Sequence, residues 1–119
     1  MRIGELAGKA GVSVRALRYY EEQELLVPSR SSGGQRHYPD AAVDQVWLIQ
    51  QFYAAGLSSK SILALMPSVR EGRATPEALS LLTAERDRLD RQSRELANAR
   101  DKLDDIIATA GSHSCVRPR

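Results

Sequence analysis

Ser13-Val-Arg-Ala-Leu-Arg-Tyr-Tyr-Glu-Glu22 is a stretch whose pattern predicts a short helix with two unlike faces. Ser13 is a favourable N-cap, and one side of the helix carries the apolar residues Val14, Leu17 and Tyr20. The opposite side repeats at i, i+3, i+4 and i+7 and carries Arg15, Arg18, Tyr19 and Glu22. Arginine and tyrosine on an exposed helix face are suited to contacts with DNA grooves and phosphates.

The residues before this stretch predict another helix and a tight turn. Apolar residues again recur at i, i+3, i+4 and i+7, at Ile3, Leu6, Ala7 and Ala10, and Gly11 then ends the helix. Two short helices joined by a glycine-containing turn form a helix-turn-helix. The same pattern also fits an ordinary helical hairpin in a small bundle.

A basic turn follows, from Pro28 to Pro39. Its Ser-Ser-Gly-Gly core is a turn signal between two short segments that could pair as a hairpin. Its full charges, Arg30 and Arg36, are both positive. A basic hairpin after a helix-turn-helix is a wing, and the alternative is a surface loop with two solvated arginines.

Two further helices are expected after the wing. Asp40 would cap a helix over residues 41–55, which Gly56 ends, with a core made of Val43, Val46, Trp47, Ile49 and Tyr53. Ser58 would cap a fourth helix that stops near Pro67, with Ile62, Leu65 and Met66 buried. Lys60 lies in its first turn, where a cation and backbone N–H groups can meet a phosphate. Residues 68–74 form a polar connector and a candidate second wing.

The rest of the chain predicts one long helix over residues 76–110, with Pro76 at its first position and Gly111 at its end. About 35 residues at 1.5 Å each give a length of roughly 50 Å. An apolar seam with a heptad repeat runs along it, at Leu82, Leu89, Leu96 and Leu103, with Ile106 nearby, while the other positions are mostly charged. Folding back on the N-terminal domain is the alternative, but the helix is longer than that domain is wide. Pairing with a second copy is therefore preferred, and the interrupted seam leaves open whether the two helices run parallel or antiparallel.

The predicted organisation is a DNA-binding domain over residues 1–70, a connector over 71–75, a dimerisation helix over 76–110 and a flexible tail over 111–119. Composition restricts the function only weakly, because 17 basic and 15 acidic residues leave a net charge of +2. The case for DNA therefore depends on where charges lie. No apolar run is long enough for a membrane span, and no secretory signal is visible. The single cysteine, Cys115, fits the reducing cytoplasm.

Several motifs in this order resemble the N-terminal domain of MerR-family regulators. They are Ile3-Gly-Glu-Leu-Ala7, Gly11-Val-Ser13, Leu17-Arg-Tyr-Tyr-Glu-Glu22, Leu25-Leu26, Pro28, Arg30, Gly33-Gly-Gln-Arg36, Tyr38 and Ala55-Gly-Leu-Ser58. The resemblance covers residues 3 to about 66, and the long helix after it is similar in placement to the family's dimerisation helix. Glu24 departs from the pattern, because the family usually has glycine there, and this leaves the end of the second helix open.

The resemblance implies a mostly α-helical fold, in which a winged helix-turn-helix domain precedes a long helix that forms an antiparallel coiled-coil homodimer. It implies binding to near-palindromic promoter DNA between the −35 and −10 elements, and distortion of that spacer, so that RNA polymerase is controlled indirectly through the DNA. Arg15 and Arg18 would enter the major groove and Tyr19 would touch backbone or bases. The full set of expected DNA-binding residues is Ser13, Arg15, Arg18, Tyr19, Arg30, Gly34, Arg36, Tyr38 and Lys60. For Tyr38, packing in the core is an equal alternative to holding a phosphate.

The signal is not predicted. Metal-sensing relatives use a cysteine near the start of the long helix and two more after it, whereas residues 74–84 here contain none and only Cys115 follows. Thiolate metal sites need at least two sulfurs and iron–sulfur clusters normally four, so neither a metal site nor a cofactor is expected. Cys115 is either an inert tail residue or a reactive thiol activated by His113 and nearby arginines. Zinc shared by His113 and Cys115 of two chains is a weaker alternative.

These residues bear on three classes of function. A transcription regulator is preferred, and an architectural DNA-binding protein without an effector would use the same surface. An enzyme is not expected, because no catalytic Cys–His or Ser–His–Asp pairing is suggested and His37 lies beside Arg36 in the wing.

Overall fold

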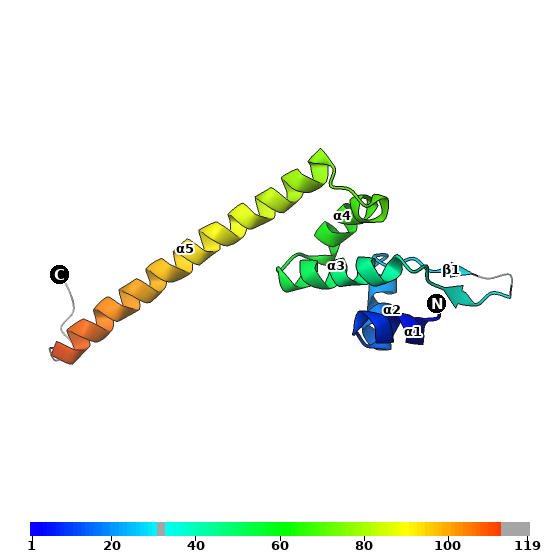
Figure 1. Cartoon of the computed structure of the whole chain (residues 1–119). Coiled ribbons are helices and arrows are strands. Elements are labelled where there is room, and N and C mark those ends of the chain that lie inside the picture. The colour runs from blue at the N-terminus through cyan, green and yellow to red at the C-terminus, as the bar shows by residue number, and fades with distance from the viewer. Residues whose placement is uncertain (31–32, 113–119) are drawn as a thin grey trace. The chain divides into compact units, whose positions relative to one another are not determined.

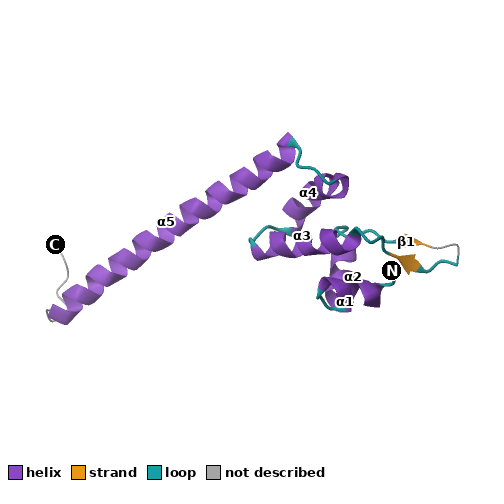
Figure 2. Cartoon of the chain, in the orientation of Figure 1, coloured by secondary structure: helices purple, strands orange, loops and turns teal. Residues whose placement is uncertain are grey.

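The computed structural model describes residues 1–30 and 33–112, and within them the chain forms five helices and one antiparallel hairpin (Figures 1 and 2). The elements are α1 (Ile3–Ala10), α2 (Val14–Glu22), β1 (Ser29–Arg30), β2 (Arg36–His37), α3 (Ala42–Ala54), α4 (Ser59–Glu71) and α5 (Pro76–Ser112). The predicted class, a mostly helical winged helix-turn-helix followed by a long helix, is confirmed. Two compact units divide the chain, Met1–Leu81 and Leu82–Arg119.

The turn between α1 and α2 follows from its sequence. Gly11 adopts a left-handed φ of 71°, and its N–H donates to the Ala7 carbonyl, which closes α1. The Ser13 hydroxyl then accepts the Ala16 N–H at 3.0 Å and caps α2. Leu6 and Leu17 are fully buried where the two helices pack.

The chain leaves α2 through a strained residue. Glu24 has a φ of 63° and is the one non-glycine residue with positive φ in the described ranges. The N–H groups of Leu25 and Leu26 both donate to the Tyr20 carbonyl, at 2.9 and 3.3 Å, so the backbone reverses here and buries both leucines. Glu24, which replaces the usual glycine, therefore lies where the backbone must be left-handed. Glycine adopts this conformation most readily.

The wing is a short hairpin in which Ser29 pairs with His37 and Arg30 pairs with Arg36. Gly34, with a φ of 80°, accepts the Arg30 guanidinium on its carbonyl at 3.2 Å. At its base, the Tyr38 N–H donates to the Met1 carbonyl at 2.7 Å, which attaches the returning strand to the start of the chain.

Two expectations for α3 were wrong. Asp40 does not cap this helix, because the capping position is Ala41 and no side chain caps it. The Asp40 backbone carbonyl accepts the Val43 N–H at 3.2 Å. Trp47 is 56% exposed, whereas the core contacts come from Ala42, Val46 and Ile49. At about 100° per residue, Ala42, Val46 and Ile49 lie within about 60° of one another, and Trp47 lies outside this buried stripe.

The fourth helix does not stop near Pro67 but continues to Glu71. Ser58 caps its start, as predicted, by accepting the Ser61 N–H at 3.1 Å. Pro67 removes the hydrogen bond that Leu63 would accept, but both residues are on the exposed side of α4, where water can solvate the free carbonyl. Gly72, with a φ of 73°, ends the helix instead.

The long helix α5 begins at Pro76, as predicted, and the Thr75 hydroxyl accepts the Ala78 N–H at 3.1 Å. Gly111 does not end it, because the helix includes Gly111 and Ser112. Its 37 residues span roughly 55 Å at 1.5 Å per residue. No helix in the described part of the chain combines the length and apolarity needed to cross a membrane.

Candidate nucleic-acid interface

The outer face of α2 carries the groove-contacting residues predicted from sequence. Arg15, Arg18 and Tyr19 are all exposed, while Leu17 and Tyr20 on the other face are buried. Within residues 1–30 and 33–112, neither arginine makes a hydrogen bond or ion pair. Their guanidinium donors are therefore available for base edges or phosphates. Ser13 lies at the start of this face, where its hydroxyl is used as the helix cap.

Three tyrosines fix α2 against α3. Tyr53 on α3 stacks on Tyr20, with ring centroids 5.9 Å apart, and lies 6.5 Å from Tyr19. The Tyr53 hydroxyl is 2.6 Å from the Ser59 hydroxyl at the start of α4, so the cluster also reaches the turn before Lys60. Burial raises the pKa of Tyr20, and Tyr53 raises it further. The cluster was not predicted from sequence, although Tyr20 and Tyr53 were both expected to pack inside.

The wing is attached to α2 through one carboxylate. Arg36 donates to the Glu21 Oε2 at 2.9 Å, and the Tyr38 hydroxyl donates to the Glu21 Oε1. Tyr38 is 1% exposed, so its ring packs in the core and its hydroxyl is committed to Glu21 in this conformation. Glu21 was not selected from sequence, because its partners are distant along the chain and only the fold brings them together.

Lys60 and Arg30 are the remaining predicted phosphate ligands. Lys60 is exposed in the first turn of α4, directly after the Ser58 cap. Arg30 is exposed on β1 and is held to the Gly34 carbonyl across the wing turn. Arg70 of α4 lines a shallow groove beside the wing and donates to the Glu24 carbonyl at 3.4 Å. Arg70 was not predicted as part of this surface.

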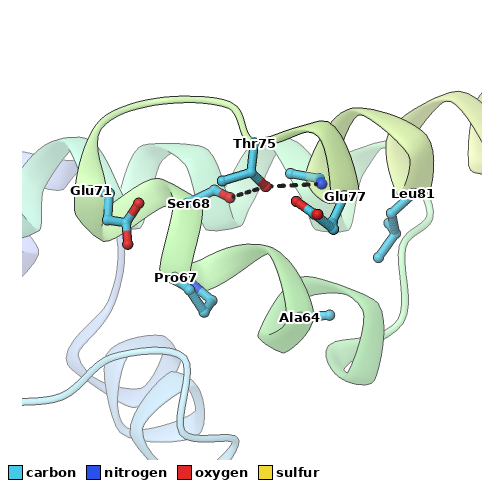
Figure 3. Close-up of a pocket in the computed structure, with 8 residues that line it drawn as sticks. Ala64, Pro67, Ser68, Glu71, Thr75, Glu77 and Leu81 are labelled. Carbon is cyan, nitrogen blue, oxygen red and sulfur yellow. Dashed lines mark hydrogen bonds between the residues drawn. The ribbon is translucent and has the colours of Figure 1, made fainter.

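A second hollow lies where α4 meets the first turns of α5 (Figure 3). It encloses about 260 Å³ and is lined by Pro67, Ser68, Thr75 and two carboxylates, Glu71 and Glu77, among others. The Ser68 and Thr75 hydroxyls lie 3.1 Å apart and pair with each other. The described residues contain no group of three or more His, Cys, Asp or Glu side chains that could hold a metal ion.

The predicted seam of α5 is exposed in the single chain. Leu89 is 40% exposed, and Leu96, Leu103 and Ile106 are 71%, 59% and 61% exposed; Leu82 is half-buried. Ion pairs cover other faces of the helix, among them Arg88 with Glu85 at 2.7 Å and Arg94 with Asp90. His113 and Cys115, the possible effector residues, lie outside the described residues.

The comparisons with known proteins agree on one family. Residues 1–69 match the family model described as "MerR HTH family regulatory protein". An uncharacterized HTH-type transcriptional regulator of Pseudomonas aeruginosa is 33% identical over 109 residues, which cover 90% of this chain and 83% of that protein. The HTH-type transcriptional regulator HmrR of Rhizobium leguminosarum is 27% identical over 116 residues, with 97% and 86% covered.

Solved structures extend the similarity to the long helix. The transcription regulator PbrR691 from Ralstonia metallidurans, in complex with lead(II), superposes with a TM-score of 0.74 at 28% identity, over 100% of this chain and 90% of that chain. HiNmlR, a regulator lacking the sensor domain and bound to promoter DNA, gives a TM-score of 0.60 at 28% identity, over 91% and 83%.

Proposed function

The chain belongs to the MerR family of helix-turn-helix transcriptional regulators, and we propose that it binds a near-palindromic promoter spacer as a homodimer and distorts it. RNA polymerase is then controlled through the shape of the DNA, in the cytoplasm. The observation that carries the DNA-binding role is the outer face of α2. There Arg15 and Arg18 are exposed, with no partner among the described residues, beside a hairpin whose arginines are also exposed.

In the proposal, some residues of this surface contact bases (readers) and others bind phosphates (holders). Arg15 and Arg18 enter the major groove, where arginine pairs with guanine in a bidentate manner. Arg30, Arg36 and Lys60 hold phosphates on both sides of that groove, since they lie on the wing and at the start of α4. Tyr19 contacts backbone or bases through its exposed edge, and Gly34 allows the wing turn to approach the DNA closely. Tyr38 is buried at the base of the wing, so its role in the proposal is to hold the wing in place and not to contact a phosphate directly.

A dimer is needed because α5 exposes its apolar seam. A helix of this length cannot bury a leucine stripe against itself. Pairing with a second copy would cover Leu89, Leu96 and Leu103 and place two DNA-binding domains at a fixed separation. Contacts on both sides of a spacer can then offset the energy needed to deform the DNA.

The division into readers and holders can be tested by two substitutions. Arg15→Ala should cost about 1–3 kcal/mol of binding free energy on the preferred duplex and relax sequence preference. Arg36→Ala should weaken all sequences alike and flatten the dependence of log affinity on log salt by about one unit. Fluorescence anisotropy on preferred and scrambled duplexes measures both. Uniform loss from both variants, with unchanged preference, would refute the division.

A further inference from the structure

Glu21 lies in the last turn of α2 and contacts the wing with both oxygens of its carboxylate. Oε2 accepts the Arg36 guanidinium at 2.9 Å, and Oε1 accepts the Tyr38 hydroxyl. The Glu21 side chain is 12% exposed, whereas the Arg36 side chain is 48% exposed. The carboxylate is therefore shielded by its partners, while the cation that it holds remains accessible from solvent.

The two partners of Glu21 lie close together on the returning side of the wing. Arg36 is in β2, Tyr38 directly follows that strand, and both contact the same carboxylate. Tyr38 anchors this segment in the core, since it is 1% exposed and its N–H donates to the Met1 carbonyl at 2.7 Å. Arg36 is thus held at a fixed place between a buried anchor and the end of α2.

We propose that Glu21 is a positioning residue, which sets the wing against α2 and presents Arg36 to a DNA phosphate. The inference rests on the proposed phosphate contact of Arg36. A guanidinium has five N–H donors, so the one used by Glu21 leaves others for a phosphate. Ordering the side chain before binding lowers the entropy lost on binding, and the fixed spacing between α2 and Arg36 sets the register of groove and phosphate contacts.

Charge alone predicts the opposite effect of this residue. A carboxylate near DNA repels phosphates, so a glutamate without a positioning role should weaken binding, and its removal should help. Glu22 provides the matched control, because it is the next residue of α2 and is exposed. In the described ranges its side chain makes no hydrogen bond or ion pair. Glu21→Ala and Glu22→Ala therefore remove the same charge from adjacent positions of α2, and Glu22 is on the side that faces solvent.

The test measures affinity by fluorescence anisotropy, using the full chain and a duplex that the unaltered protein enriches from a random-sequence pool. Glu21→Ala should weaken binding about tenfold and lower the salt slope by about one unit. Glu22→Ala should leave affinity unchanged or increase it. In the Arg36→Ala background, Glu21→Ala should change affinity by less than about twofold, because the residue that it positions is gone.

Two results would overturn the positioning role. One is a Glu21→Ala variant that behaves like Glu22→Ala, and the other is an equal loss with and without Arg36. If Glu21→Ala does not fold, Glu21→Gln keeps an acceptor for Tyr38 but loses the charge-assisted bond to Arg36, and should weaken binding about threefold with the same dependence on Arg36. If Arg36→Ala itself binds as tightly as the unaltered chain, the proposed phosphate contact fails, and the positioning role fails with it.

Discussion

Glu24 shows at the residue scale how a departure from the family pattern costs stability. Its φ of 63° places an L side chain in the left-handed region, which is about 1–2 kcal/mol less favourable than ordinary backbone. Glu24→Gly should raise the free energy of unfolding by about 1 kcal/mol, because relief of this cost exceeds the greater freedom that glycine has in the unfolded chain. In the described ranges its side chain makes no hydrogen bond or ion pair that the change would remove.

Chemical denaturation measures this difference directly. Glu22→Gly is the control, because Glu22 lies within α2 and has no positive φ. Glu22 is the last residue of α2, so glycine there relieves no strain and has more freedom in the unfolded chain, and the change should not raise the free energy of unfolding. A Glu24→Gly variant that is no more stable than the unaltered chain would show that the strain is relieved elsewhere.

Residues whose structure depends on neighbours in sequence could be predicted. The Ser13 and Ser58 caps and the Gly11 stop follow from local rules, and the structure confirms each of them. The link from Glu21 to Arg36 and Tyr38 could not be predicted, because its partners are 15 and 17 residues away and meet only after the core has formed. Burial of Tyr38 has the same origin.

At the scale of elements, the sequence predicts where the helices lie, but it does not predict every buried face or every helix end correctly. Periodicity predicts α3, yet the apolar character of Trp47 predicts it in the core, and the helix turns that residue outward. Pro67 predicts a stop, but its side of α4 is exposed, so water can solvate the carbonyl that loses its hydrogen bond, and the helix continues to Glu71. Gly111 likewise lies within α5.

The dimerisation helix carries the prediction that belongs to this scale. Replacing Leu89 and Leu96 with glutamate puts two charges into the proposed seam, where burial without a partner is strongly unfavourable. The double variant should therefore sediment as a monomer at concentrations where the unaltered chain is a dimer. Both positions are exposed in the single chain, so the change should not unfold it.

A control with the same charge change lies on the opposite face of α5. Ala84 and Asn98 follow Leu82 and Leu96 by two residues, about 200° around the helix, and both are exposed. The double variant Ala84→Glu, Asn98→Glu should remain dimeric. An unchanged sedimentation coefficient for the leucine variant, or dissociation of both variants, would refute the seam.

At the scale of the whole molecule, the proposed activity depends on duplication. One copy offers one face of α2 and one wing, which is enough for a half-site, and α5 supplies the means to join two copies. The sequence indicated this organisation through the heptad leucines and the family resemblance.

The central claim is that two copies of this chain read one near-palindromic site, and enrichment of random-sequence duplexes by the purified chain tests it most directly. Because a two-fold dimer places identical surfaces on both half-sites, sequencing the bound fraction should yield an inverted repeat with a constant separation. The Leu89→Glu, Leu96→Glu variant should lose that repeat. Enrichment of a single unrepeated element, or no enrichment at all, would contradict the account.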